Sequence, residues 1–148
     1  MMKKETKNIA LKRLSEHLSE KKLRATSQRE IILGTFIDLG RHTTAEELYE
    51  ALKKFDSSIG HATVYRALRL FVDAGIAREL NFNDGSVRYE SVIGKEPHDH
   101  IICKKCGAMV EFLDEKIREA QDEIAKKYGY SIKNRSHILF GICPKCRR

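Results

Sequence analysis

The 148-residue sequence has no long hydrophobic run, since no apolar stretch approaches the roughly 20 residues of a membrane-spanning helix. Its N-terminus is basic but lacks the apolar core of a secretory signal peptide. Hydrophobic residues make up 41% of the chain and charged residues 33%, a balance typical of globular rather than disordered proteins. We therefore expect a cytoplasmic protein with no membrane partner, built from one ordinary domain or two small ones.

Cysteine is scarce, and the four cysteines of the chain form two Cys-x2-Cys pairs. A reducing cytoplasm disfavours structural disulfides. Each short pair presents two thiolates toward one point, so two pairs together predict a tetrahedral zinc site. A redox-active dithiol is the main alternative, but two pairs that close onto each other argue against it. We expect one structural Zn(II) per chain, bound by Cys103, Cys106, Cys143 and Cys146.

The net charge of +7 is concentrated near the start of the chain. Residues 1–30 contain nine Lys or Arg against four Glu. Such an excess fits an anionic partner, most commonly nucleic acid. A solvated helix face in a basic protein is the alternative, and charge alone does not exclude it.

Apolar residues at helical spacing, followed by two strand-like runs, organise the first part of the chain. Thr44 and Glu47 have the spacing of a capping box. Asn83-Asp84-Gly85 is a strong hairpin signal. The expected elements are helices over 8–22, from Thr26-Ser27 to Gly40, after Thr44 and from His61 to Phe71, and strands Ala77–Phe82 and Val87–Val92.

Helices followed by a two-stranded hairpin predict a winged helix-turn-helix, in which the last helix enters the major groove. A small helical domain with a decorative hairpin is the alternative. The polar face of the fourth helix favours DNA binding, because an exposed Tyr65 beside Arg66 is costly on an idle surface but suits base edges and phosphates. Thr63 lies on the same polar face. We assign this domain to residues 1–92.

The second part of the chain has few apolar residues for a core of its own. Gly and Pro in residues 93–97 mark a hinge. Because so small a module needs further stabilisation, we expect zinc and a partner subunit to supply it. Residues 98–148 are therefore expected to form a small α/β dimerisation domain, and the whole chain an α+β protein. Its expected elements are strands ending near Cys103, Phe112 and Ile142, and a helix from an Asp114 cap to Tyr128 with Ile117, Ala120 and Ile124 inward.

A strand through His98 and His100 would point both imidazoles to one side, with Asp99, Ile101 and Cys103 on the other. A lone His-x-His is equally consistent with a polar face. Further candidate ligands are His42 in a loop, Glu90 near the end of the two-stranded hairpin (the wing) and Glu111 after the first cysteine pair. A mixed His/carboxylate site suits Fe(II), Mn(II) or Zn(II) better than Mg or Ca. A site drawn from both domains would bias their arrangement, which is the physical basis of a metal switch.

Six motifs over nearly the whole chain carry a family resemblance. They are Arg24-Ala25-Thr26-x-x-Arg29, Ala45-Glu46-x-Leu48-Tyr49, Gly60-x-Ala62-Thr63-Val64-Tyr65-Arg66, His98-Asp99-His100-x-Ile102-Cys103-x-x-Cys106-Gly107, Glu111-Phe112 and Gly141-x-Cys143-x-x-Cys146. In these motifs the sequence resembles the ferric uptake regulator (Fur) family of metal-dependent bacterial repressors.

The resemblance implies a metal-loaded homodimer that binds an AT-rich palindromic operator in double-stranded DNA and controls iron uptake and homeostasis genes, with no small-molecule substrate. By position, Tyr65 and Arg66 contact bases and Arg24 reaches into the minor groove. The implied regulatory metal is Fe(II), with Mn(II) or Zn(II) able to replace it in vitro. The implied ligands of this metal are His42, Glu90, His98, His100 and Glu111.

The sequence also departs from the family pattern. Many relatives have a third His where this chain has Pro97, and some members use that His in a further metal site. Arg118 and Arg135 stand where that site has its Glu and its second His. We therefore expect the further site to be absent, Asp99 to cap or pair locally, and His137 to lie at the surface.

Glu90 and Glu111 favour the iron-responsive branch, because the peroxide-sensing branch typically has Asp at these positions. Peroxide-, zinc- and manganese-sensing members remain alternatives. A metallohydrolase is disfavoured, because up to five protein ligands leave little room for a catalytic water and no nucleophile-and-base constellation accompanies them. A zinc-stapled interaction module without a metal switch is a third possibility. We expect no enzymatic activity.

Overall fold

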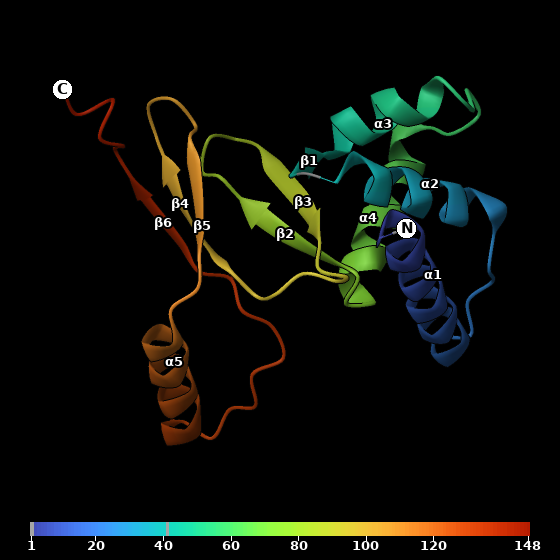
Figure 1. Ribbon diagram of the computed structural model, residues 1–148. Helices are drawn as coiled ribbons and strands as arrows, with labels where there is room; N and C mark the ends of the chain where they lie inside the picture. Colours follow the sequence, from blue (N-terminus) through green and yellow to red (C-terminus); the bar gives the residue numbers. More distant parts are fainter. Residues whose placement is uncertain (1, 41) are drawn as a thin grey trace. The chain divides into compact units, whose positions relative to one another are not determined.

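The computed structural model describes residues 2–40 and 42–148 of the chain. The chain divides into two compact units, Met1–Glu96 and Pro97–Arg148, called here the first and second unit. Each contains a three-stranded sheet together with helical structure, so the expected α+β class is confirmed (Figure 1). None of the described helices is long and apolar enough to cross a bilayer.

The helices of the first unit pack around one hydrophobic core. Its largest side chains include Phe36 and Phe71, whose ring centroids lie 6.0 Å apart, and the same core contains the fully buried Leu48. Such burial of aromatic and leucine side chains is the main source of stability in a unit of this size. The helices are α1 (Met2–Glu20), α2 (Ser27–Leu39), α3 (Ala45–Lys53) and α4 (His61–Asp73).

Local sequence signals set several helix ends. Thr44 and Glu47 form the expected capping box at the start of α3. Gly40 ends α2 in the left-handed conformation, with φ of 61°, which glycine adopts without a steric penalty. Helix α1 begins earlier than predicted, because Lys3 donates to the Asp38 carbonyl and Lys7 pairs with the Asp38 carboxylate at 2.6 Å. The spacing of apolar residues gives no information about polar contacts of this kind.

The sheet of the first unit has the order β1-β3-β2 and is antiparallel. Strands β2 (Ala77–Asn81) and β3 (Val87–Ser91) form the predicted hairpin, turning through Asn83 with φ of 55°. Strand β1 (Thr43–Thr44) was not predicted, because two residues carry no periodic signal. It pairs Thr43 with Tyr89 and so adds an edge to the wing.

The sheet of the second unit is mixed, with β4 (Asp99–Cys103) in the centre. Strand β5 (Met109–Phe112) pairs with it antiparallel and β6 (Ile138–Gly141) parallel. Helix α5 (Glu115–Lys127) starts at the expected Asp114 cap, whose carboxylate accepts from two backbone N–H groups.

The predicted inward stripe of α5, made of Ile117, Ala120 and Ile124, is not buried within the single chain. No residue of α5 is buried, and Ile124 is 59% exposed. Figure 1 shows the reason, since the helix stands beyond the end of the sheet of its own unit.

Candidate metal centres and nucleic-acid interface

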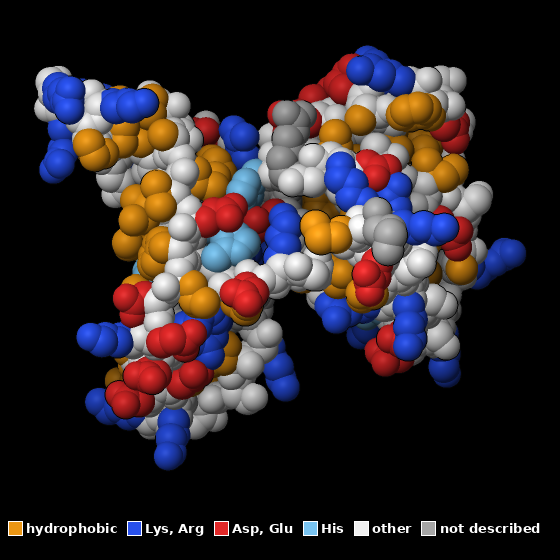
Figure 2. Space-filling view, viewed as in Figure 1, with side chains coloured by type: hydrophobic (Ala, Val, Ile, Leu, Met, Phe, Trp, Pro, Cys, Tyr) orange, Lys and Arg blue, Asp and Glu red, His pale blue; other side chains and the backbone are white. Residues whose placement is uncertain are grey.

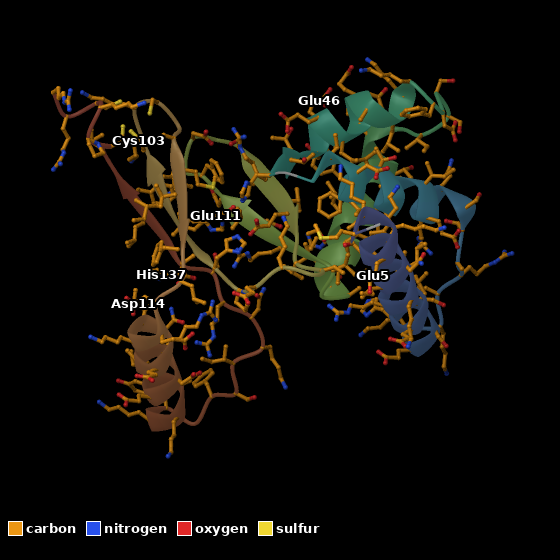
Figure 3. The ribbon with its side chains drawn as sticks, viewed as in Figure 1. Glu5, Glu46, Cys103, Glu111, Asp114 and His137 are labelled. Atoms are coloured by element: carbon orange, nitrogen blue, oxygen red, sulfur yellow. The ribbon has the colours of Figure 1, made fainter. Side chains whose placement is uncertain are left out.

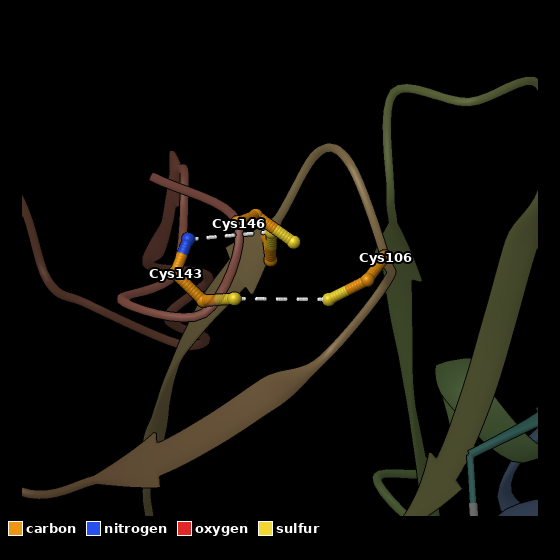
Figure 4. Close-up of side chains that lie close together, drawn as sticks. Cys106, Cys143 and Cys146 are labelled. Carbon is orange, nitrogen blue, oxygen red and sulfur yellow. Dashed lines mark hydrogen bonds between the residues drawn. The ribbon is translucent and has the colours of Figure 1, made fainter. Parts of the chain in front are cut away.

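The four cysteines converge at one end of the second unit's sheet (Figure 4). Cys103 ends β4, and Gly107, with φ of 74°, lets the chain turn back after Cys106. Strand β6 runs parallel to β4 and pairs Gly141 with Cys103, so the segment that follows delivers Cys143 and Cys146 to the same place. The four sulfur atoms lie within 4.8 Å of one another.

The cysteine cluster has the geometry of a structural zinc site. All four residues are free thiols. Cys106 Sγ lies 3.8 Å from Cys143 Sγ, and a tetrahedron with Zn–S bonds of about 2.3 Å has edges of about 3.8 Å. The geometry therefore fits the expected zinc ion and not a pair of disulfides, for which bonded sulfurs lie about 2.05 Å apart.

The electrostatics of the cluster also favour a cation. Backbone N–H groups of Cys143 and Cys106 lower the pKa of the Cys103 thiol to about 6. Hydrogen bonding to the neighbouring sulfurs of Cys143 and Cys106 raises the pKa of Cys146 to about 12. The Cys103 thiolate therefore forms readily, whereas ionisation of the Cys146 thiol requires a compensating positive charge such as a bound metal ion.

The first unit holds one pair of the predicted regulatory ligands, His42 and Glu90. Strand β1 pairs Thr43 with Tyr89 in antiparallel register, which brings the preceding His42 beside Glu90 on β3. His42 Nε2 lies 2.9 Å from Glu90 Oε2. Burial raises the pKa of the Glu90 carboxyl, but hydrogen bonds from His42 and Arg78 outweigh it and hold that pKa well below its usual range. Glu90 is therefore an ionised carboxylate, as a metal ligand must be.

The second unit holds the other three predicted ligands on one face of its sheet. His98 and His100 contact each other edge to face, with ring centroids 4.9 Å apart. Glu111 on β5 (Figure 3) pairs in register with His100, and its Oε1 lies 3.7 Å from His98 Nε2. The predicted strand parity is confirmed by these contacts. Two imidazoles and a carboxylate on one face form a donor set that suits Fe(II), Mn(II) or Zn(II).

Asp99 lies on the opposite face of β4, and its partner lies 38 positions away in the sequence, not nearby as expected. Its Oδ2 lies 3.4 Å from Nδ1 of His137, which stands just ahead of β6 (Figure 3). The expectation that His137 is a plain surface residue is wrong, because the parallel pairing of β6 with β4 brings it beside this buried carboxylate. The His137 ring also contacts the Phe112 ring edge to face, with ring centroids 6.1 Å apart.

Arg135, at a departure from the family pattern, anchors helix α5. Its guanidinium donates to the Arg118 carbonyl at 3.4 Å and to Gln121 Oε1 at 3.1 Å, and it pairs with Asp122. A guanidinium carries no lone pair for a metal and holds its proton permanently. The contacts of Arg135 are therefore structural, in line with the expected absence of a further metal site there.

The predicted DNA-reading residues lie on the exposed side of the first unit. Tyr65 is 55% exposed on α4, next to the exposed Arg66, whose Nη2 donates to Thr63 Oγ1 at 3.4 Å. Arg24 is exposed in the segment between α1 and α2, where its carbonyl accepts from Arg29. A groove between α2 and α4 is lined by Arg29, Arg66 and Arg69 together with Thr63. This surface therefore carries guanidinium and hydroxyl groups, several of them along one face of α4.

Part of the N-terminal positive charge has a structural role that sequence reasoning missed. Arg13 donates to the Gly75 carbonyl at 2.8 Å, where α4 has just ended. Lys3 and Lys7 hold Asp38 near the end of α2. Cations at helix C-termini are favourable because the helix dipole is negative there. Figure 2 shows further blue Lys and Arg side chains on the surface of this unit.

Comparison with known proteins gives a consistent result. A model described as the ferric uptake regulator family matches residues 20–140. The ferric uptake regulation protein of Campylobacter jejuni is 36% identical over 141 residues, covering 94% of this chain and 89% of that protein. Its counterpart from Bordetella parapertussis is 41% identical over 128 residues, covering 85% of this chain and 91% of the other.

Solved structures agree with the sequence matches. The ferric uptake regulator of Helicobacter pylori, described as having three functional metal binding sites, superposes with a TM-score of 0.76 at 30% identity, covering 96% of this chain and 94% of that one. The Pseudomonas aeruginosa regulator with manganese gives a TM-score of 0.72 at 30% identity, covering 88% and 97%.

The family match extends across both units and includes the wing and the first cysteine pair, Cys103 and Cys106. The relatives are named as regulators of ferric uptake, and the chain is a transcriptional regulator of this kind and not an enzyme. The chain belongs to the ferric uptake regulator family.

Proposed function

We propose that the protein is a metal-responsive repressor that acts in the cytoplasm as a homodimer. Its metal-loaded form binds an AT-rich palindromic operator in double-stranded DNA and controls genes of iron uptake and homeostasis. The observation that carries the proposal is the His42–Glu90 pair, because it builds two metal donors into the β1–β3 edge of the wing. A metal bound there acts directly on the DNA-binding unit.

The regulatory metal in this proposal is Fe(II), held jointly by the donors of the first unit and those of the second. Support comes from the clustering of donors within each unit and from the relatives named for ferric uptake. A Francisella tularensis regulator with iron is 34% identical with a TM-score of 0.66. Residues 1–92 are the DNA-binding domain, 93–97 the hinge and 98–148 the dimerisation domain. One ion bound by both domains would favour a single arrangement of them.

Manganese and zinc are the alternative regulatory metals, since a zinc-bound manganese uptake regulator is 38% identical with a TM-score of 0.56. Glu90 and Glu111 favour the iron-responsive over the peroxide-sensing branch. Mass spectrometry should therefore find no oxygen added to His42 or His98 after peroxide treatment of the Fe(II)-loaded protein. An added oxygen on either ring would assign the chain to the peroxide-sensing branch.

A row of exposed apolar residues crosses the second unit's sheet and supports the homodimer. Ile101 pairs in register with Val110 on one side and Leu139 on the other, so the three side chains share a face. They are 40%, 58% and 45% exposed, and orange apolar side chains gather on this sheet in Figure 2. A contiguous apolar patch of this kind marks an interface, and in a homodimer the same patch of a second copy covers it.

Replacing Ile101 by Asp should convert the dimer to a monomer, because it places a charge at the centre of this row. Sedimentation equilibrium measures the change, and the zinc content should stay at one per chain. Phe55→Asp is the matched control, since Phe55 is 81% exposed but lies in the first unit. A dimer that survives Ile101→Asp would assign the interface elsewhere.

Metal-titrated DNA binding tests the proposed function. Zinc-loaded protein is mixed with duplexes selected from a randomised DNA library, and Fe(II) (without oxygen) or Mn(II) is added. Affinity should rise with metal and fall steeply with salt, because Lys and Arg release counterions from the phosphates. Arg66→Ala should weaken selected duplexes by about 1–3 kcal/mol more than random ones if Arg66 contacts a base. Affinity that does not depend on metal would contradict the repressor and favour a zinc-stapled interaction module.

A further inference from the structure

Arg78 holds the carboxylate of Glu90 from the opposite strand of the wing. The two residues are register partners on β2 and β3. Arg78 Nε donates to Glu90 Oε1 at 2.9 Å, and Nη2 of the same guanidinium contacts the same oxygen. The other oxygen, Oε2, lies 2.9 Å from His42 Nε2. The two carboxylate oxygens therefore have different partners, and one of these partners is a permanent cation.

This ion pair is shielded from water. The Glu90 side chain is 1% exposed and the Arg78 side chain 11%. A buried carboxylate without a counter-charge is strongly destabilising, whereas a guanidinium that donates two N–H groups compensates it. The wing hairpin thus carries its own neutralising charge at Glu90 before any metal arrives.

A divalent ion at His42 and Glu90 would meet the same guanidinium. Because Oε1 accepts from Arg78, Oε2 would be the oxygen that Glu90 offers to the ion. The ion would also add two positive charges beside an existing one in a poorly solvated region, where charges are weakly screened. Both effects weaken metal binding relative to a carboxylate that lacks this counterion.

We propose that Arg78 is a built-in counterion of Glu90, which keeps the metal-free wing folded and lowers the affinity of the regulatory site for its divalent ion. The inference rests on the proposed function and adds a residue that sets the metal response without being a ligand. Arg78 acts through Glu90 and is a positioning residue.

The test compares Arg78→Gln with the wild type in the full-length, zinc-loaded protein. Mn(II) binding is measured by calorimetry, and thermal unfolding is followed with and without Mn(II). The metal-free variant should unfold at a lower temperature than the wild type. Its Mn(II) dissociation constant should fall about tenfold, a typical coupling between two sites. Consequently Mn(II) should raise the unfolding temperature more in the variant than in the wild type.

Two further variants isolate the direct contact. Arg88→Gln removes the same charge from the same hairpin, but this guanidinium lies over the Phe82 ring, 4.7 Å from its centroid. Its Mn(II) affinity should match the wild type. Arg78→Lys keeps the charge and loses the paired donors. The Mn(II) affinity of this variant should be higher than that of the wild type and lower than that of Arg78→Gln. This variant also decides the question if Arg78→Gln does not fold.

Unchanged or weaker Mn(II) binding by Arg78→Gln, or by Arg78→Lys in its place, would overturn the counterion role. Arg78 would then only orient Glu90 or support the hairpin. If the zinc-loaded wild type binds no Mn(II) at all, the proposed regulatory site fails and the inference with it. If the wild type binds Mn(II) but the variants bind no tighter, the inference alone fails.

Discussion

Replacing Cys103 by Ser is expected to remove the zinc ion, unfold the second unit and abolish the dimer. Among the described residues of this unit, Ile102 and Cys103 are its buried hydrophobic residues, and helix α5 buries none. Structural zinc contributes about 10–16 kcal/mol, as much as the entire net stability of a typical domain, which is about 5–15 kcal/mol. A unit with so small a core cannot replace that contribution.

Metal analysis by mass spectrometry should find about one zinc per chain in the wild type and none in the variant. Circular dichroism and sedimentation should show lost structure in residues 97–148 and a monomer. His137→Ala is the control, because His137 lies in the same unit and contacts Asp99 instead of the cysteines. A Cys103→Ser protein that keeps its zinc and its dimer would show that the cluster is not the structural site.

The parts of the fold that the sequence predicted are those governed by neighbouring residues. The Thr44–Glu47 capping box, the left-handed Gly40 and the Asn83-Asp84-Gly85 turn each act within a few positions, so their signals are visible in one stretch of sequence. Strand parity likewise separated His98 and His100 from the cysteine face.

The features that were missed depend on pairing between distant segments. Strand β1 has two residues and exists because Thr43 pairs with Tyr89, which is also why His42 meets Glu90. His137 meets Asp99 across 38 positions of sequence. The pairing of Arg78 with Glu90 could have been predicted from the sequence, because the two residues lie equally far from the centre of the hairpin turn at Asp84. No comparable count predicts the pairing of β6 beside β4.

Strand β4 carries residues of both proposed metal sites. Cys103 at its end belongs to the cysteine cluster, on which we expect folding of the second unit to depend. His100, three residues earlier, faces the other side of the same strand beside Glu111. Because side chains alternate along a strand, a substitution on the His98 and His100 face should leave the cysteine cluster in place, whereas loss of zinc should unfold the strand that carries both sets. Sensing can therefore be removed by substitution without loss of the fold, but not the reverse.

Replacing His42 by Ala is expected to abolish the metal response and leave the fold intact. His42 contributes one imidazole to Glu90, and Arg78 still neutralises that carboxylate when the imidazole is gone. Loss of an outer-shell partner alone typically weakens metal binding by about 10–100-fold, and loss of a ligand should weaken it at least as much. The variant should therefore need at least about tenfold more Fe(II) or Mn(II) for half-maximal DNA binding.

Fluorescence anisotropy on the selected duplex measures this shift, while zinc content and sedimentation should match the wild type because the cysteines lie in the other unit. His17→Ala is the matched control, since His17 lies on α1 and should leave the metal response unchanged. A His42→Ala protein that binds DNA at the wild-type metal concentration would remove His42 from the regulatory site. Loss of zinc or of the dimer together with DNA binding would mean that His42 supports the fold, and the separation of sensing from folding would then be wrong.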